Sequence, residues 1–351
     1  MTVIPQRALF RRFPALAKHL PWIQLGSLPT PVQQIELPGR AELWVKRDDL
    51  SGEQYGGNKV RKLEFILAEA QRRESQRLIT VGAAGSHHAL ATAVFGRLLG
   101  LQVTLVLFPQ PLTPHVRDVL LLDQAFGAEL RWAPRMELIP AAALLARVAH
   151  RRERCFVIAP GGSDPLGTLG YVDAALELAE QIKAGECPLP GTIHVAAGTL
   201  GTTAGLALGF ALAGLPIHIR ATRITSCLLT NRVALRRLVV HTGKLLRSAG
   251  VPVPTVDPVL SRVRLVHDQI GPGYGHPTPA AEACTGRLAS AGLMLDPTYT
   301  SKAAADVLAC LDGAGGGVHL LWQTLSAAHP RPPAPADAAR LPSPFRRYLS
   351  G

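Results

Sequence analysis

The sequence predicts an α/β fold with open, mostly parallel twisted sheets and helices on both faces, and three observations predict it. Short, continuously apolar runs, such as LITVGAA at 78–84, alternate with amphipathic stretches of helical length, such as 60–73. Apolar strands that alternate with helices indicate βαβ crossovers, in which both faces of the sheet are covered. A chain of 351 residues exceeds the usual size of one domain, so we expect two domains with the functional cleft between them.

The expected strands are the apolar runs, and the expected helices are the amphipathic stretches between them. Glycines recur at 52–57, and Gly, Pro and Ser concentrate at 160–167, which marks two domain boundaries. We therefore expect residues 55–163 to form a smaller inserted α/β domain, and residues 1–54 and 164–351 to form the larger one. Strands are predicted at 78–84, 103–108, 155–160, 192–197, 217–222, 263–268 and 318–322, and helices at 60–73, 87–99, 113–126 and 168–184.

Composition and charge exclude several classes of protein. The chain has 47% hydrophobic and 18% charged residues, as folded α/β proteins do. Its formal net charge is +12, but the arginines are scattered and form no block interleaved with aromatic residues, so we expect no nucleic-acid partner. The N-terminus lacks the apolar core of a signal peptide, and no window offers the roughly 20 apolar residues of a membrane span, so we expect no membrane partner. Five cysteines without a CxxC pattern indicate reduced thiols and a cytoplasmic protein.

The most specific stretch is QYGGNKVRKLE at 54–64. Asn58 follows two glycines and is expected to cap a helix, so Lys59 falls in the first helical turn. The positive end of the helix dipole, together with Arg61 and Lys62, disfavours the protonated amine of Lys59. A lysine in this position suits Schiff-base chemistry, although a solvated lysine at a helix start explains the spacing alone more simply.

Two turns between a strand and a helix suit anions. The Gly/Thr-rich turn at 195–205 exposes backbone N–H groups that favour a phosphate, although a tight turn without a ligand explains it equally well. It has neither the GK[ST] ending of a P-loop nor the GxGxxG order of a dinucleotide site. The turn at 80–89 suits a substrate carboxylate, with Ser86 as the helix cap. His87 and His88 are adjacent and point in different directions on a helix, so we expect no metal site.

Two tyrosines lie in turns at the ends of strands, Tyr274 in GYGHP and Tyr299 in LDPTYTSK. Parallel sheets present ligand groups from such turns, although each tyrosine alone is explained as well by packing. In this order the five stretches closely resemble the pyridoxal 5′-phosphate (PLP) enzymes of fold type II that include D-cysteine desulfhydrase and aminocyclopropane-carboxylate deaminase. The resemblance runs from 28 to 324, and GGNKxRKLE at 56–64 is its most specific part.

The resemblance implies a two-domain fold like that of the tryptophan synthase β subunit, PLP as the cofactor, and a homodimer. It implies that Lys59 binds PLP as a Schiff base and then removes the Cα proton of a small amino-acid substrate, after which a β leaving group departs and a keto acid and ammonia are formed. The implied catalytic residues are Lys59, Ser86, Tyr274 and Tyr299. The implied cofactor-binding residues are Asn58, Lys59, His87, Ala197, Gly198, Thr199, Leu200, Gly201, Thr202 and Thr300. The implied substrate-binding residues are Ser86, His87, His88 and Tyr274.

Two positions depart from the family pattern. Thr300 stands where the deaminases have Glu, and a neutral hydroxyl at the pyridine nitrogen favours elimination of a good leaving group, as in the desulfhydrases. His87 stands where both branches carry Asn, and we hypothesise that its imidazolium pairs with a second acidic group of the substrate. The expected function is therefore α,β-elimination and deamination of a small, D-cysteine-like amino acid. The alternatives are an aminocyclopropane-carboxylate deaminase or related β-eliminating lyase, a catalytically silent PLP-binding protein, and a nucleotide-binding protein that uses only the Gly-rich turn.

Overall fold

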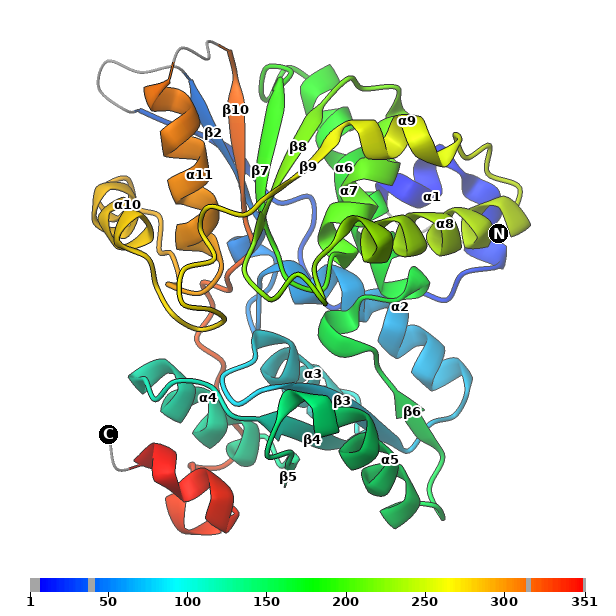
Figure 1. Ribbon diagram of the computed structural model, residues 1–351. Coiled ribbons are helices and arrows are strands. Elements are labelled where there is room, and N and C mark those ends of the chain that lie inside the picture. Colours follow the sequence, from blue (N-terminus) through cyan, green and yellow to red (C-terminus); the bar gives the residue numbers. More distant parts are fainter. Residues whose placement is uncertain (1–6, 37–41, 314–316, 350–351) are drawn as a thin grey trace.

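The computed structural model describes residues 7–36, 42–313 and 317–349, and it contains two sheets with helices packed around them in these ranges (Figure 1). The larger sheet has the order β1-β2-β10-β7-β8-β9. β1 is antiparallel to β2, and all the other neighbouring strands are parallel. The expected open, mostly parallel sheet is confirmed. Its strands are β1 (Val32–Ile35), β2 (Leu43–Arg47), β7 (Thr192–Ala197), β8 (His218–Arg223), β9 (Val263–Val266) and β10 (His319–Gln323).

The smaller sheet has the order β5-β4-β3-β6, and each neighbouring pair is parallel. The apolar runs at 78–84, 103–108 and 155–160 coincide with three of its strands. β5 does not stand out in the sequence, because its four residues ELRW include two charged ones and form no continuous apolar run. The strands are β3 (Arg77–Ala83), β4 (Gln102–Phe108), β5 (Glu129–Trp132) and β6 (Cys155–Val157).

Helices cover both sheets (Figure 1). The α-helices are α1 (Ala8–Arg12), α2 (Asn58–Arg72), α3 (His87–Leu98), α4 (Pro114–Ala125), α5 (Ile139–Ala149), α6 (Pro165–Lys183), α7 (Gly201–Ala213), α8 (Arg232–Ser248), α9 (Val256–Ser261), α10 (Pro279–Ala289) and α11 (Thr300–Asp312). Short 3₁₀ turns are η1 (Pro14–Lys18), η2 (Asp48–Leu50), η3 (Met136–Leu138), η4 (Pro160–Gly162), η5 (Ala338–Arg340) and η6 (Ser343–Leu349).

Both faces of the larger sheet are buried. Leu320 and Trp322 of β10 point into a core shared with α6, α7 and α8. Leu321, between them, points into a separate core shared with α10 and α11. Figure 1 shows these two groups of helices on opposite sides of the sheet. This burial explains why the strand reads as an uninterrupted apolar run.

The last described segment, η6, packs against the smaller sheet. Leu341, Phe345 and Tyr348 are buried in the same core as α3 and α4. The hydroxyl of Tyr348 donates to the carbonyl oxygen of Gln110 at 3.0 Å. A segment after residue 164 thus packs on the smaller sheet, although the sequence assigned only residues 55–163 to the smaller domain. The domain boundaries at 55 and 163 stay a prediction.

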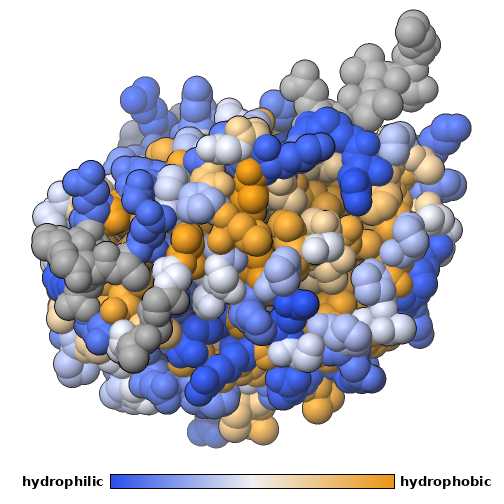
Figure 2. Space-filling view, turned by 90° about the horizontal axis from the view of Figure 1, so that it is seen from above, coloured by the Kyte–Doolittle hydropathy of each residue, from blue (hydrophilic) through white to orange (hydrophobic). Residues whose placement is uncertain are grey.

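In the described ranges, no helix combines the length and the apolar character that a membrane crossing requires. Figure 2 shows the molecule from above, with hydrophilic side chains spread around the face and apolar ones exposed between them. The hydrophilic residues therefore form no single block on this face.

A buried cluster of ionic groups fixes α2 to the larger sheet. Arg61, which is 1% exposed, donates to both carboxylate oxygens of Asp48 and of Glu177 at 2.7–3.0 Å. Lys46 Nζ donates to Glu177 at 2.6 Å, and the Tyr171 hydroxyl donates to Asp48 at 2.6 Å. Burial alone raises the pKa of Glu177, but the charges of Arg61 and Lys46 outweigh it and lower that pKa to about 2. Two cations and two carboxylates therefore neutralise one another inside the fold.

Replacing Arg61 with Met is expected to lower the free energy of unfolding by about 3–5 kcal/mol, because it leaves two buried carboxylates short of positive charge. The matched control is Arg72→Met, at the exposed end of the same helix, where Arg72 pairs with Glu69. That change is expected to cost far less, because the pair lies at the surface, where solvent and salt screen it. Urea unfolding followed by circular dichroism measures both values, and equal stabilities of the two variants would contradict this role for Arg61.

Candidate active site

A cavity of about 580 Å³ lies where the first turns of α2, α3 and α7 meet, and both sheets contribute to its wall. Three helix starts at one cavity give it positive electrostatic potential, because the first N–H groups of a helix have no partner within the helix. The wall brings together every predicted site residue except Ala197 and Thr300. The predicted residues on it are Asn58, Lys59, Ser86, His87, His88, Gly198, Thr199, Leu200, Gly201, Thr202, Tyr274 and Tyr299.

Lys59 is the second residue of α2, so it lies in the first turn as predicted. The prediction that Asn58 caps this helix is wrong, because Gly57 is the N-cap and Asn58 is the first helical residue. Gly57 has φ +79°, and a Cβ there would lie 2.6 Å from the carbonyl oxygen of Thr324, so only glycine fits. Asn58 Nδ2 instead donates to Thr202 Oγ1 at 3.3 Å, which joins the start of α2 to the start of α7.

The amine of Lys59 loses its proton more easily than an ordinary lysine. Burial lowers the pKa of Lys59 to about 8. The predicted direction is confirmed, but its cause is burial and not the charge of Arg61, which is paired with Asp48 and Glu177. A neutral amine is the form that attacks a carbonyl carbon and accepts protons.

In the cofactor-free protein, we expect the amine of Lys59 to titrate near pH 8. Because the protonated amine is not a nucleophile, covalent attachment of PLP is expected to be slow below pH 8 and to accelerate as the pH rises through that value. The rate at which the visible absorbance of bound PLP appears, measured from pH 6 to 10, gives the midpoint. A midpoint at the ordinary lysine value above pH 10 would contradict the effect of burial.

The turn between β7 and α7 forms an anion-binding cradle. Leu200 adopts the left-handed backbone conformation, with φ +66°, and so turns the chain into α7. Among the described residues, the backbone N–H groups of Thr202 and Thr203 have no hydrogen-bond partner, and neither does the buried hydroxyl of Thr203. Both threonines line the cavity, so the residues present fit a phosphate group. Thr203 lies one residue beyond the predicted set.

A second lysine faces this cradle. Lys62 Nζ donates to the carbonyl oxygen of Gly161 and to Ser163 Oγ, both at 3.1 Å. Ser163 Oγ in turn lies 2.6 Å from Thr199 Oγ1. Burial, and then the charge of Lys59, hold the pKa of Lys62 well below its usual value. A bound dianion would favour its ammonium form, so Lys62 is a candidate phosphate ligand that sequence reasoning treated only as a neighbouring charge.

The start of α3 is open to the cavity in the same way. Ser86 caps this helix as predicted, because its Oγ accepts the Ala89 N–H at 3.3 Å. The backbone N–H groups of His87 and His88 have no partner among the described residues, which suits a carboxylate. The ring of His88 is buried, with Nε2 3.0 Å from Thr80 Oγ1 and with Nδ1 lacking a partner in the described part of the chain.

His87 lines the cavity as a neutral imidazole. Burial, and then the neighbouring His115, lower the pKa of His87 to about 4. The ligand-free protein therefore holds no imidazolium here at neutral pH, and pairing of His87 with a second acidic group of the substrate stays a prediction, since that group would itself raise this pKa. Nδ1 of His87 lies 2.8 Å from the hydroxyl of Tyr55, and burial raises the pKa of that hydroxyl. Tyr55 therefore stays protonated and shares one hydrogen bond with Nδ1, and the tautomer of the ring decides which of the two groups donates.

Tyr274 and Tyr299 form a hydrogen-bonded pair on another part of the wall. Their hydroxyl oxygens are 2.5 Å apart. Burial raises the pKa of Tyr274 to about 12 and that of Tyr299 well above its ordinary value, so both side chains are neutral. Within the pair one hydroxyl donates to the other, and the second hydroxyl keeps a proton that it can donate to a ligand.

Asp296 lies on the cavity wall, whereas Thr300 is buried beside it. Asp296 accepts the backbone N–H of Tyr299 at 2.6 Å, that of Thr298 at 3.0 Å, and the hydroxyl of Thr300 at 2.8 Å. These bonds hold the first turn of α11. The contact of Thr300 with the pyridine nitrogen stays a prediction. Sequence reasoning missed Asp296, and the Asp-Pro pair before a helix is the signal that could have found it.

Much of the rest of the wall is apolar, and sequence reasoning missed several of its larger side chains. These side chains come from segments far apart in the chain, so no local spacing relates them. They include Phe108, Met136, Ile139, Leu229 and Ile270.

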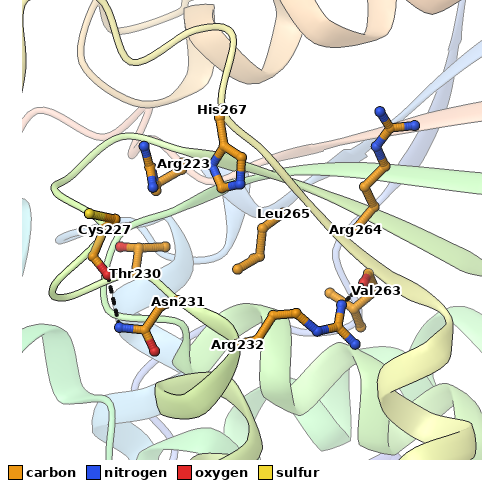
Figure 3. Close-up of a pocket in the computed structure, with 9 residues that line it drawn as sticks. All are labelled: Arg223, Cys227, Thr230, Asn231, Arg232, Val263, Arg264, Leu265 and His267. Atoms are coloured by element: carbon orange, nitrogen blue, oxygen red, sulfur yellow. Dashed lines mark hydrogen bonds between the residues drawn. The ribbon is translucent and has the colours of Figure 1, made fainter.

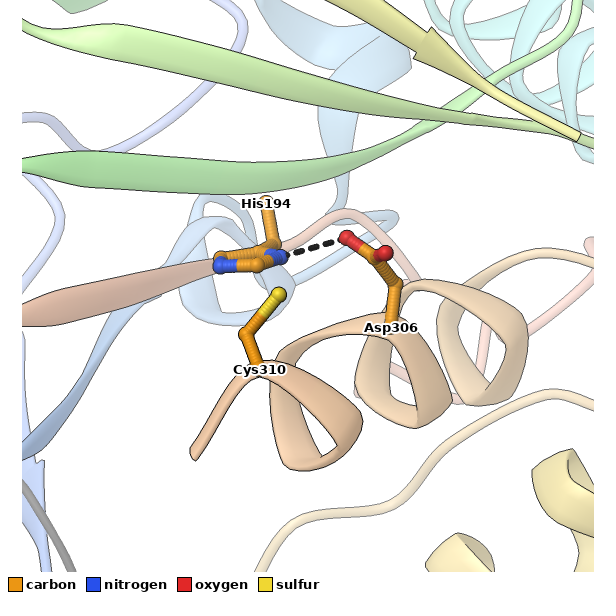
Figure 4. Close-up of side chains that lie close together, drawn as sticks. All are labelled: His194, Asp306 and Cys310. Carbon is orange, nitrogen blue, oxygen red and sulfur yellow. Dashed lines mark hydrogen bonds and ion pairs between the residues drawn. The ribbon is translucent and has the colours of Figure 1, made fainter. Parts of the chain in front are cut away.

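Among the described residues, a group of three possible metal ligands lies away from this cavity, at His194, Asp306 and Cys310 (Figure 4). Asp306 is 2.7 Å from His194 Nδ1 and also accepts two hydrogen bonds from Arg220, at 2.6 and 3.0 Å. A guanidinium in this position opposes a bound cation. The group therefore acts as an ionic link between β7, β8 and α11.

Comparisons with known proteins agree on one family. The family model described as pyridoxal-phosphate dependent enzyme matches residues 23–321. The chain is 34% identical over 311 residues to nocardicin C-9′ epimerase of Nocardia uniformis subsp. tsuyamanensis, which covers 87% of this chain and 92% of that protein. It is 33% identical over 305 residues to D-cysteine desulfhydrase of Salmonella paratyphi A, with 83% and 88% covered. The solved structure of an ACC deaminase homologue has a TM-score of 0.76 at 31% identity, with 90% and 95% covered.

Proposed function

This chain belongs to the family of pyridoxal-phosphate-dependent enzymes, and on that premise we propose that it removes the Cα proton of a small amino acid and eliminates its β substituent. The resemblance inferred from the sequence is thereby confirmed. One observation carries the proposal: the low-pKa amine of Lys59 shares a cavity with an anion cradle at α7 and with an open helix start at α3. D-cysteine is the proposed substrate, because D-cysteine desulfhydrase matches most of the chain.

The residues at the cavity fit the cofactor of the family. Lys59 would hold it covalently, and Thr202, Thr203 and Lys62 would hold its phosphate. When bound, PLP withdraws electrons from the Cα atom and makes the Cα proton acidic.

Lys59 is suited to carry the Cα proton. With a pKa of about 8, its amine is basic enough to accept the proton and acidic enough to return it near neutral pH. The backbone at Lys59 is held in place because Arg61, two residues later on α2, is locked into the buried ionic cluster.

The substrate carboxylate is proposed to bind at the start of α3. The free N–H groups of His87 and His88 and the partial positive charge of the helix end suit a carboxylate. The hydroxyl of Ser86 accepts the Ala89 N–H and still has its own proton to donate. Binding here would place the substrate within the same cavity as Lys59.

The Tyr274–Tyr299 pair is proposed to protonate the leaving group. Both hydroxyls are neutral and hydrogen-bonded to each other, so one of them holds a proton available to a departing thiolate. With D-cysteine and one water consumed, the products are hydrogen sulfide, ammonia and pyruvate.

A second candidate function is epimerisation of an amino-acid centre, which the 34% identity to nocardicin C-9′ epimerase favours. An epimerase returns a proton to the opposite face of Cα and releases no sulfide or ammonia. Incorporation of solvent deuterium at Cα with inversion, measured without keto-acid release, would favour this function over elimination.

The cytoplasmic location and the homodimer stay predictions. The five cysteines are free thiols, which supports the first. Light scattering of the purified protein measures the second.

Lys59→Ala is expected to abolish keto-acid release from D-cysteine and the borohydride-reducible attachment of PLP, because no other amine in the cavity has the position of Lys59. The fold is expected to persist, since Ala is a strong helix former. Lys244→Ala, at an exposed position of α8, is the control and should keep both properties. Pyruvate and sulfide assays with D- and L-amino acids, and intact mass after reduction, measure the outcome. Normal turnover by Lys59→Ala would refute the proposal.

His87→Asn is expected to keep turnover within about tenfold, because a neutral amide has both an acceptor and a donor and can still pair with the Tyr55 hydroxyl. His87→Phe removes that partner and leaves the buried Tyr55 hydroxyl unpaired, which is expected to lower stability by about 1–3 kcal/mol. Steady-state kinetics and thermal unfolding of the pair separate the two effects. A loss of activity in His87→Asn, together with loss of an ionisation near pH 6 that the parent enzyme shows, would instead support an imidazolium at His87 in the substrate complex.

A further inference from the structure

A second cavity, of about 490 Å³, opens at the ends of β8 and β9 beside the start of α8 (Figure 3). Arg223 ends β8, Arg232 begins α8, and His267 follows β9. Figure 3 shows Arg223 and His267 at one end of this cavity and Arg232 at the other, with Leu265 between them.

The charge of this cavity is of one sign. Its basic lining residues are Arg223, Arg232, Arg264 and His267, and no carboxylate of the described residues lines it. In the described part of the chain, Nε of Arg223 is buried and has no hydrogen-bond partner. This Nε has almost no accessible surface, so a ligand in the cavity would meet the terminal nitrogens of the guanidinium instead.

Arg232 is held in place without losing its charge. Its guanidinium donates to the carbonyl oxygens of Val263 at 3.1 Å and of Leu260 at 3.4 Å. Carbonyl partners orient a guanidinium but carry no net charge, so its positive charge still acts on the cavity. The apolar side chain of Leu265 lies between the basic ends, which suits a ligand with a carbon skeleton.

We propose that this second cavity binds a small organic oxyanion, either a carboxylate or a phosphate monoester. Its charged group contacts Arg223, and its carbon skeleton packs on Leu265. The binding is independent of the reaction proposed above.

The anion would act on the active site through residues 224–231, which wall both cavities. Thr230 lines the second cavity, and its hydroxyl donates to the carbonyl oxygen of Gly198 in the phosphate cradle. Thr230 Oγ1 is also 2.5 Å from Thr225 Oγ1, and Thr225 lines the active-site cavity. An occupied second cavity therefore holds the cradle in place and slows the release of PLP.

Cys227 reports occupancy, because it is exposed and lines the second cavity. The holoenzyme is treated with iodoacetamide at constant ionic strength in chloride, inorganic phosphate or succinate, and alkylation of Cys227 is followed by mass spectrometry. We expect a saturating oxyanion to slow this alkylation about tenfold relative to chloride. Protection by only one of the two anions supports the site and assigns the ligand to that chemical class. No protection by either anion overturns the proposal.

Arg223→Gln is compared with Arg237→Gln, which removes one charge from an exposed position of α8 outside the cavity. We expect protection and slowed PLP release to be lost in the first variant and kept in the second. If both variants lose protection and slowed PLP release equally, the effect depends only on the net charge of the protein, and the proposal is overturned. Arg223→Lys keeps the charge, so it should retain part of the protection. If Arg223→Gln does not fold, Arg223→Lys is used in its place. If folded Arg223→Lys keeps as much protection as Arg237→Gln does, the shape of the Arg223 guanidinium does not matter, and the assignment of the contact to Arg223 is overturned.

Discussion

The buried pairing of Arg61 with Asp48 and Glu177 is the constraint on which the active-site cavity depends. It joins α2 to the end of β2 and to α6 at one point inside the fold. The contact is close, since a Cβ on Gly170 of α6 would lie 2.2 Å from the carbonyl oxygen of Arg61. A displacement of α2 would separate charges in a medium that solvates them poorly. Lys59 therefore has a fixed position relative to the larger sheet.

The cavity combines neutral side chains with positive helix ends. Lys59 loses part of its charge, and His87, Tyr274 and Tyr299 are neutral, all because burial disfavours their ionised forms. The positive potential comes from backbone dipoles, which cannot be titrated. Negative charge therefore enters the site with its ligands, and the neutral side chains meet those ligands as hydrogen-bond donors and acceptors.

Local patterns predicted the features that depend on nearby residues. The apolar strand runs, the position of Lys59 in a first turn and the cap at Ser86 are all set by short-range geometry and are present in the structure. The features that depend on packing could not be predicted. Lys62 and Asp296 reach the cavity because distant segments converge there, and His87 is neutral because the fold buries it. The cap at Gly57 depends in the same way on a carbonyl group more than 250 residues away.

The return of the chain to the smaller sheet affects how the cavity can open. The chain passes from one sheet to the other three times, and the first and third of these crossings are hydrogen-bonded to each other. Asn58 N–H donates to the Thr324 carbonyl oxygen at 3.1 Å, and Gly56 N–H donates to Ser326 Oγ at 2.8 Å. Two bonded segments form a ribbon, and a ribbon bends about one axis more easily than it twists. We therefore expect the two sheets to rotate relative to each other about a single hinge axis. Lys59 lies near that axis, and the start of α3 lies on the part that moves. The crossings lie near residues 51–57, 160–164 and 324–340.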